Sequence, residues 1–263
     1  MSSVDTTDPR ATVALTDEQQ RIVAHDCGPA LVYAVAGAGK TTAMVYRVER
    51  LVRERVFAPE HILLSSFNKS AVEDLGRALA SWPHCRRVAR HTLHALGYKI
   101  VRHAADRGRL PRMAQDHLKI NGEEHQLIWM AKDRARQRGL VAPGELDALD
   151  EEDLRTFISA CKGNLLYPDL AAAELPPAAL MVAQQAEAPL SLPWYLDLYR
   201  LHEEVRRERD WLTFDDMLLL GWEALVRYPD VLAFWQRSFD CVIVDEFQDV
   251  MTPRETTKGS GSF

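Results

Sequence analysis

Short apolar runs alternate with amphipathic stretches in the first hundred residues and again near residue 240. The runs have the length and β-branched content of strands buried in a parallel sheet, and they lie at 31–35, 61–66 and 241–244. Val88–Arg90 is a shorter candidate strand. Apolar residues at helical spacing after Thr41, Ala71 and Thr92 predict the connecting helices. The pattern therefore predicts an α/β domain with a parallel sheet flanked by helices.

From about residue 105 to about residue 205 the pattern changes to helices and loops. Helices are predicted over Glu124–Arg138, Glu151–Cys161 and Pro193–Arg209. The stretch Ala171–Ala188 is rich in alanine and has a weak pattern. We expect this block to be an α-helical insertion whose charged residues cover solvent-facing surfaces. Helices beginning at Thr213 and after Pro229 return the chain to the first domain.

A phosphate-binding loop is predicted between the run 31–35 and the helix that follows it. The pattern G-x-x-x-x-G-K-[ST] is matched except at its first position, which is alanine. The candidate nucleotide-binding residues are Ala34, Val35, Ala36, Gly37, Ala38, Gly39, Lys40, Thr41 and Thr42. Strand, loop and helix occur in the required order, which favours this interpretation over a glycine-rich turn that only caps a buried helix.

The chemistry of a bound nucleotide explains these residue types. Gly37 and Gly39 let backbone N–H groups approach an anion closely, and the start of the next helix adds partial positive charge. Lys40 is predicted to reach the β- and γ-phosphates. The Thr41 hydroxyl is predicted to be a ligand of Mg²⁺. This ion binds the nucleotide phosphates and only a few oxygen atoms of the protein.

Two acids follow the apolar run at 241–244. Asp245 is predicted to hold Mg²⁺, and Glu246 to orient or deprotonate an attacking water molecule. Val-Asp-Glu after a strand is a weak signal alone. It becomes strong together with Lys40, because a phosphate loop needs a carboxylate on the metal side at the end of a neighbouring strand.

Gln19 has two candidate roles. Thr16-Asp17-Glu18-Gln19 fits a capping box at the start of a helix. The side-chain amide also offers the donors and the acceptor needed to bind an adenine edge. The tetrapeptide alone favours the cap.

Phe67, Asn68 and Lys69 follow the second predicted strand, where ligands bind in open α/β sheets. An aromatic ring, an amide and a cation on one loop suit single-stranded nucleic acid. The alternative, a Phe67 packed in the core and a solvated Lys69, is equally compatible with the residues. Arg86, Arg87 and Arg90 form the best local candidate for a phosphate-binding patch, although a solvated face suits any single one of them.

Composition limits the remaining possibilities. Among 263 residues, 47% are hydrophobic and 27% charged, as in ordinary globular proteins, and the net charge of -6 gives no global footprint for nucleic acid. The four cysteines show no C-x-x-C pair and are predicted to be buried thiols in a reducing cytoplasm. We find no basic-then-apolar leader and no apolar run of membrane-spanning length, so we expect a cytoplasmic protein without a membrane partner.

The order of these motifs resembles the N-terminal half of a superfamily 1 helicase of the UvrD/Rep type, over roughly residues 15–250. Segment 15–19 resembles the adenine-reading Q motif, 34–41 motif I, 67–71 motif Ia, 92–96 motif Ib and 245–249 motif II. The family itself commonly has alanine in place of the first glycine of motif I. Leu93 departs from the phenylalanine usual in motif Ib.

The resemblance implies a phosphate-loop, RecA-like fold that uses ATP and Mg²⁺ and moves on single-stranded DNA. It implies adenine binding by Gln19, coupling of nucleotide state to DNA by Gln248, and DNA contacts by Phe67, Asn68, Lys69, Thr92 and His94. It also implies an ATP-binding domain at 15–104 and 206–251 and an inserted 1B subdomain at 105–205. The polar composition of residues 1–14 predicts a mobile tail, and the polar, low-complexity composition of 252–263 predicts a tail or linker.

The family's later motifs, with the arginines of a second motor domain, have no counterpart after motif II. We therefore expect the 263 residues to bind ATP weakly, to hydrolyse it slowly at best and not to unwind DNA, with a second motor domain or a partner protein acting in trans. The alternatives are a nucleotide-dependent DNA- or protein-binding module without hydrolysis, and another phosphate-loop ATPase.

Overall fold

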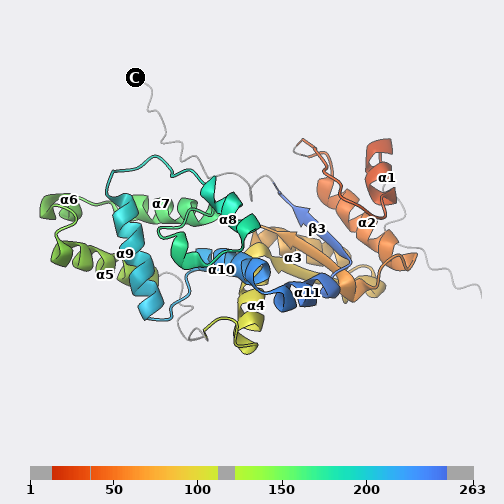
Figure 1. Cartoon of the computed structure of the whole chain (residues 1–263). Helices are drawn as coiled ribbons and strands as arrows, with labels where there is room; N and C mark the ends of the chain where they lie inside the picture. Colours follow the sequence, from red (N-terminus) through yellow and green to blue (C-terminus); the bar gives the residue numbers. More distant parts are fainter. Residues whose placement is uncertain (1–13, 36, 112–121, 248–263) are drawn as a thin grey trace, which may run out of the picture. The chain divides into compact units, whose positions relative to one another are not determined.

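The computed structural model describes residues 14–35, 37–111 and 122–247 (Figure 1). Contacts between residues divide the chain into two compact units, and each is described by itself. The first contains residues up to His91 together with Ser238–Asp245, and the second contains Thr92–Arg237 and the residues from Glu246 onward. The subdomain boundaries implied by the family resemblance stay a prediction.

A three-stranded sheet organises the first unit. Its strands are β1 (Ile62–Ser66), β2 (Ala89–Thr92) and β3 (Cys241–Asp245), in the order β2-β1-β3. β1 and β3 are parallel, and their register runs from Ile62 opposite Cys241 to Ser66 opposite Asp245. The parallel α/β fold predicted from the apolar pattern is therefore confirmed.

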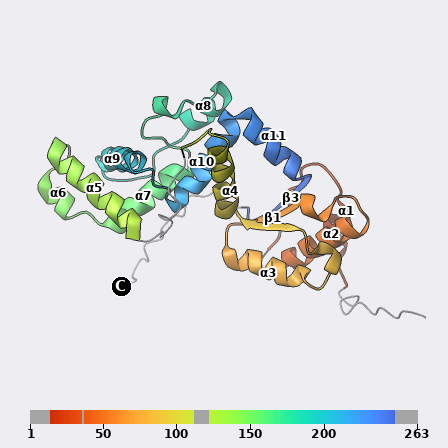
Figure 2. The same cartoon turned by 90° about the horizontal axis from the view of Figure 1, so that it is seen from below.

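Helices pack against this sheet because their apolar stripes face it. They are α2 (Lys40–Arg53) and α3 (Lys69–Leu79). α1 (Asp17–Ala24), which has no buried residue, contacts α2, and η1 (Pro59–His61) and η2 (Pro83–Cys85) are short 3₁₀ turns. Val48 and Leu51 of α2 and Leu75 of α3 share one buried cluster with Ile62 and Leu64 of β1. Figure 2 shows α2 and α3 beside β1 and β3.

The run 31–35 is not a buried strand, so this expectation was wrong. No regular structure is assigned to it, and Leu31 and Tyr33 are 62% and 88% exposed. β3 is an edge strand of the described sheet, and residues 31–35 do not pair with it as a further strand. An apolar run becomes a buried strand only when it pairs with a neighbouring strand of a sheet. The residues of the run do not by themselves specify that pairing.

The second unit is helical. Its helices are α4 (Leu93–Asp106), α5 (Gly122–Arg138), α6 (Pro143–Asp147), α7 (Glu151–Gly163), α8 (Pro177–Gln184), α9 (Tyr195–Glu208), α10 (Phe214–Arg227) and α11 (Pro229–Ser238), with the 3₁₀ turn η4 (Ala171–Ala173). The helices predicted over 124–138, 151–161 and 193–209 are confirmed, with ends shifted by a few residues. The helices predicted from Thr213 and after Pro229 are also present.

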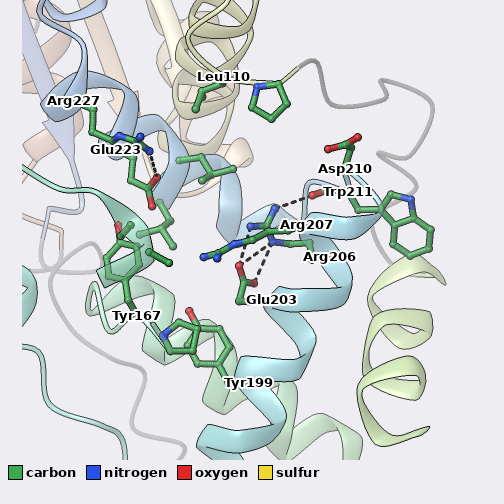
Figure 3. A pocket seen from close by; sticks show the side chains of 16 residues that line it. Leu110, Tyr167, Tyr199, Glu203, Arg206, Arg207, Asp210, Trp211, Glu223 and Arg227 are labelled. Carbon is green, nitrogen blue, oxygen red and sulfur yellow. Dashed lines mark hydrogen bonds and ion pairs between the residues drawn. The ribbon is translucent and has the colours of Figure 1, made fainter. Parts of the chain in front are cut away.

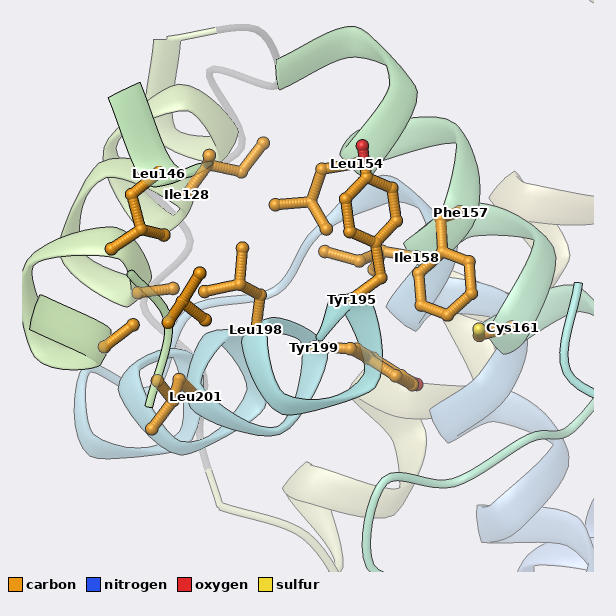
Figure 4. Close-up of a cluster of buried hydrophobic side chains, with 13 residues drawn as sticks. Ile128, Leu146, Leu154, Phe157, Ile158, Cys161, Tyr195, Leu198, Tyr199 and Leu201 are labelled. Carbon is orange, nitrogen blue, oxygen red and sulfur yellow. The ribbon is translucent and has the colours of Figure 1, made fainter. Parts of the chain in front are cut away.

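A buried apolar cluster joins α5, α6, α7 and α9 (Figure 4). Leu154 and Ile158 of α7 face Leu198 and Tyr199 of α9, and Ile128 of α5 packs against the same group. These side chains are almost completely removed from water, which provides the main stabilisation of the helical block.

Four charged residues of the second unit form one buried group, and two of them, Lys162 and Glu203, lie within 105–205, contrary to the expectation that the charges of this helical block cover solvent-facing surfaces. The four are Lys162, Glu203, Arg206 and Asp216. Burial of a charge is tolerated only where opposite charges and hydrogen bonds replace water, and these side chains supply both to one another.

Three of the four cysteines are buried, as predicted, and Cys27 is exposed, which corrects the prediction for that residue. Burial raises the pKa of the Cys85 thiol to about 11 and that of Cys161 to about 12, so both are protonated at neutral pH. Among the described residues, no helix is long and apolar enough to cross a membrane.

α4 and α10 cross at a point where both carry glycine. A β-carbon added at Gly97 would lie 2.3 Å from the Met217 carbonyl oxygen, and one added at Gly221 would lie 3.0 Å from Gly97 Cα. Backbone thus meets backbone, and the crossing leaves no room for a side chain.

We predict that Gly97→Ala lowers the free energy of unfolding by ~1–3 kcal/mol, because the added methyl group must separate the two helices. Urea unfolding followed by circular dichroism measures the change. Gly163→Ala is the matched control, since its helical glycine has open space around it, and we expect a gain of at most ~1 kcal/mol. Wild-type stability in Gly97→Ala would contradict the close crossing.

Candidate nucleotide site and nucleic-acid surface

The predicted phosphate loop adopts a backbone that requires glycine at two positions. Gly37 and Gly39 have φ angles of 79° and 77°, in the left-handed region that other residues rarely adopt. Gly39 is the N-cap of α2, and the Ala38 N–H donates to the Val35 carbonyl across the turn at 3.2 Å. Ala36 lies outside the described residues. The glycines therefore occupy the positions where the sequence analysis required them.

Lys40, Thr41 and Thr42 form the first turn of α2. The first-turn N–H groups of any α-helix have no partner within the helix, and they carry partial positive charge. α2 has no acidic residue in this turn, so nothing there repels an anion. Thr41 is exposed to solvent, and Lys40 is partly exposed. The loop and helix terminus have the donor chemistry of a phosphate site.

Gln19 connects α1 to this loop. Its Oε1 accepts a hydrogen bond from the Thr16 N–H at 3.0 Å, and the Thr16 hydroxyl accepts one from the Gln19 N–H at 3.2 Å. The predicted capping box is thus confirmed. The Gln19 Nε2 also donates to the Ala38 carbonyl at 3.0 Å, and a β-carbon at Gly39 would lie 2.5 Å from this nitrogen. The side chain offered for adenine binding lies directly against the phosphate loop.

Asp245 ends β3 opposite Ser66, which ends β1. The register therefore places the predicted metal carboxylate at the same sheet edge as the loop that begins with Phe67. Asp245 is 8% exposed, and the adjacent Ser65 and Ser66 hydroxyls are buried without a hydrogen-bond partner in the part of the chain that the structure describes. Glu246 follows with φ of 50°, a strained conformation for glutamate of the kind that gathers at functional sites.

The donor set suits Mg²⁺ rather than a softer metal. A threonine hydroxyl from Thr41 and a carboxylate from Asp245 are hard oxygen ligands, and Mg²⁺ takes its remaining ligands from phosphates and water. Over residues 14–35, 37–111 and 122–247 no group of three or more His, Cys, Asp or Glu side chains could hold a metal ion. Metal ligation by Thr41 and Asp245 stays a prediction.

The loop 67–69 offers its polar groups to solvent. Asn68 is exposed and is the N-cap of α3, without a side-chain capping bond. The Lys69 side chain is 87% exposed and pairs loosely with Glu73 at 3.7 Å. Phe67 is partly exposed. The loop is therefore accessible, as a nucleic-acid contact requires, and that role stays a prediction.

Thr92 and His94 have structural tasks at the start of α4. The Thr92 hydroxyl accepts a hydrogen bond from the Ala95 N–H at 3.1 Å and caps the helix. His94 is buried and stacks on Phe214, with ring centroids 3.7 Å apart and planes 17° apart. Burial lowers the pKa of His94 to about 4, so its imidazole is neutral at pH 7. Direct DNA contact by these two residues stays a prediction, and His94 lies inside the protein.

Phe214 is a candidate functional residue that the sequence analysis missed. Its ring is 42% exposed while it stacks on His94. In the sequence it was only the first residue of a predicted helix. The available signal was an aromatic residue between the N-cap Thr213 and two acids.

Two other predicted features are more ordinary. Arg87 pairs with Glu60 at 3.3 Å, and the Arg90 guanidinium lies over Gly76, so these two are engaged on the protein surface. Gln248 lies outside the described residues.

A cavity of about 250 Å³ occurs in the second unit, beside α9 and α10 (Figure 3). In its wall, Arg206 donates hydrogen bonds to Glu203 at 2.8 Å and to the Trp211 carbonyl at 2.9 Å. Glu223, also in the wall, lies 3.8 Å from Arg227. These two acid–base pairs therefore neutralise one another, and none of the sequence predictions involves this cavity.

Taken together, the parallel sheet, the glycine-bearing loop at the start of α2 and the acid at the end of β3 define a phosphate-loop protein of the RecA-like α/β class. The chain belongs to the UvrD/REP helicase N-terminal domain family, whose model matches residues 15–254.

Relatives with assigned names agree with this family. The chain is 27% identical over 247 residues to the putative ATP-dependent DNA helicase YjcD of Bacillus subtilis, covering 91% of the chain and 29% of that protein. It is 27% identical to the ATP-dependent DNA helicase PcrA of B. subtilis, covering 89% and 29%, and 26% identical to the ATP-dependent DNA helicase Rep of Escherichia coli, covering 90% and 32%. The chain thus spans about a third of the length of these relatives.

We predict that His94→Phe weakens the pH dependence of stability between pH 6.5 and pH 5. A histidine whose folded pKa is about 4 binds fewer protons in the folded than in the unfolded state there, so wild-type stability falls as the pH falls. This histidine changes the free energy of unfolding by up to ~1.4 kcal/mol for each pH unit. Phenylalanine keeps an aromatic ring for stacking but has no group that titrates. Urea unfolding across this range measures the slope, and equal slopes in both proteins would refute the assignment.

Proposed function

We propose that this chain is the ATP- and Mg²⁺-binding part of a DNA helicase that moves along single-stranded DNA and couples ATP hydrolysis to strand separation. The observation that carries the proposal is the glycine-bearing loop at the start of α2, in a chain whose β3 ends in Asp245 and is followed by Glu246, and whose family is that of UvrD/REP helicases. The names of the relatives support ATP as the nucleotide and DNA as the substrate.

The chain's own residues have separate tasks at the nucleotide. Lys40 and the N–H groups of the α2 first turn hold the phosphates, while Thr41 and Asp245 hold Mg²⁺. The ion, when bound, neutralises charge that develops on the phosphate oxygens. Glu246 orients the attacking water and accepts its proton. Gln248, as the family resemblance implies, couples the state of the bound nucleotide to the binding of DNA.

The proposed DNA contacts come from exposed side chains. Phe67 stacks on a base, and Asn68 and Lys69 bind the backbone, as suits single strands. Phe214 offers a second aromatic surface, because its ring is exposed and supported by His94. Thr92 and His94 then contribute by shaping the start of α4. The proposed ATP-binding domain comprises 15–104 and 206–251, and the 1B-like insertion comprises 105–205.

Translocation and unwinding are proposed for the complete motor. A second motor domain, in the same polypeptide or in a partner protein, supplies transition-state arginines, which are worth ~10³–10⁵ in rate in related phosphoryl-transfer enzymes. Turnover by the 263 residues alone is accordingly slow.

The direct test is binding and turnover of ATP with Mg²⁺, with and without single-stranded DNA. We expect Lys40→Ala to weaken ATP binding by at least about tenfold, because a lost phosphate contact of ~1.4 kcal/mol corresponds to that factor. Glu246→Gln should retain binding and abolish the residual turnover. Lys99→Ala removes an equal charge outside the loop and is the control.

Two results would count against this function. ATP affinity that is the same in Lys40→Ala and wild type would remove the nucleotide site. Robust unwinding by the 263 residues alone would show that no second motor domain is required.

Gln19 allows a sharper test of base recognition. Glutamate at this position keeps an oxygen for the Thr16 N–H and hence the capping box, but it loses the donor that reaches Ala38. We predict that Gln19→Glu keeps the melting temperature within a few degrees and reduces the preference for ATP over GTP, measured by competition with a fluorescent ATP analogue. Unchanged base preference would limit Gln19 to its structural role.

A further inference from the structure

A buried group of four charges connects α7, α9 and α10 in the second unit. Lys162 Nζ lies 2.7 Å from Asp216 Oδ1 and 2.8 Å from Glu203 Oε1. Arg206 completes the group, with its Nε 3.2 Å from Asp216 Oδ2 and its Nη2 2.8 Å from Glu203 Oε2. All four side chains are at most 5% exposed, and two cations face two anions. The Glu203–Arg206 side of the group is drawn in Figure 3.

Asp216 also forms the start of α10. Its Oδ2 accepts hydrogen bonds from the Thr213 N–H at 2.9 Å and from the Thr213 hydroxyl at 2.6 Å, which closes the capping box of this helix. Lys162 Nζ lies 3.4 Å from the same hydroxyl. One carboxylate therefore joins the first turn of α10 to a lysine of α7.

Phe214 lies inside this fixed turn, between the capping residue Thr213 and Asp216. Its ring reaches back to α4, where it stacks on the buried His94, and it remains 42% exposed. A rigid turn on one side and a buried ring on the other hold the exposed aromatic surface in one orientation. An aromatic ring held in this way is suited to stack on a base without an entropic cost of ordering it.

Stability alone does not explain the group. Buried ion pairs commonly contribute no more than apolar residues of the same size, because both charges must leave water, and their best-attested benefit is a defined geometry. Here the geometry that they define is that of the turn carrying Phe214.

We propose that Lys162 is a positioning residue for single-stranded DNA binding, which acts through Asp216 and the first turn of α10 to hold the Phe214 ring. This inference rests on the proposed function, since it assigns the helical block a part in binding DNA. In this proposal Lys162 itself does not contact the DNA.

The test is a double-mutant cycle in the 263-residue chain, with affinity for a fluorescein-labelled oligo(dT) measured by anisotropy. We expect Phe214→Ala to weaken binding about tenfold, in the range of a lost base stack. Lys162→Met should weaken it roughly three- to tenfold, and the double variant should be no weaker than Phe214→Ala, because residues on one path are not additive. Lys162→Arg, which keeps the charge, should recover most of the affinity.

Two controls separate positioning from general damage. Leu198→Ala destabilises the apolar cluster of the same helices and should leave oligo(dT) affinity unchanged at a temperature where it is folded. Binding of a fluorescent ATP analogue should be the same in Lys162→Met and wild type. If Lys162→Met does not fold, Asp216→Asn replaces it, since its amide oxygen still accepts from the Thr213 N–H.

The outcomes are distinguishable. Failure of the wild-type chain to bind oligo(dT) would overturn this inference and the DNA part of the proposed function together. Wild-type affinity in Lys162→Met, with a loss in Phe214→Ala, would overturn the positioning role alone. Additive losses, or no recovery by Lys162→Arg, would show that Lys162 does not act through Phe214.

Discussion

The in-register pairing of β1 with β3 is the constraint on which the candidate nucleotide site depends. These strands are far apart in the sequence, yet Ile62 pairs with Cys241 and Ser66 with Asp245. A second link is made at the start of the strands, where the Asp240 N–H donates to the His61 carbonyl at 2.9 Å. A slip of one residue would turn Asp245 to the opposite face of the sheet. The position of the metal-side acid is therefore set by a register, and the long helical segment between the strands can vary without moving it.

Local chemistry explains why much of this site could be predicted. Gly37 and Gly39 were expected to bring backbone towards an anion, and both have the positive φ that few other residues adopt. Thr16 and Gln19 were expected to close a capping box, and they do so. These features depend on neighbours within a few residues, so the sequence specifies them directly. The positions of β1, β3 and most of the helices followed from apolar periodicity in the same way.

Features that depend on distant partners were not predicted. His94 is polar in the sequence, but Phe214 covers it, and the two residues are separated by the whole helical block. Lys162 and Asp216 look like solvated charges until α7 and α10 bring them together at 2.7 Å. The run 31–35 has the composition of a buried strand, and its exposure shows that composition does not supply a partner edge. Contacts between distant segments are a property of the fold and not of any short window.

The exposed run before the phosphate loop also bears on how this protein behaves in solution. Leu31, Tyr33 and Val35 present apolar side chains to water, and β3 has an edge that carries no further strand in the described part of the sheet, with Val242 57% exposed. An unpaired strand edge with an exposed apolar side chain is a template for addition of a strand from another molecule. Self-association at high protein concentration would begin here, and charged substitutions at Tyr33 or Val242 are the places to suppress it.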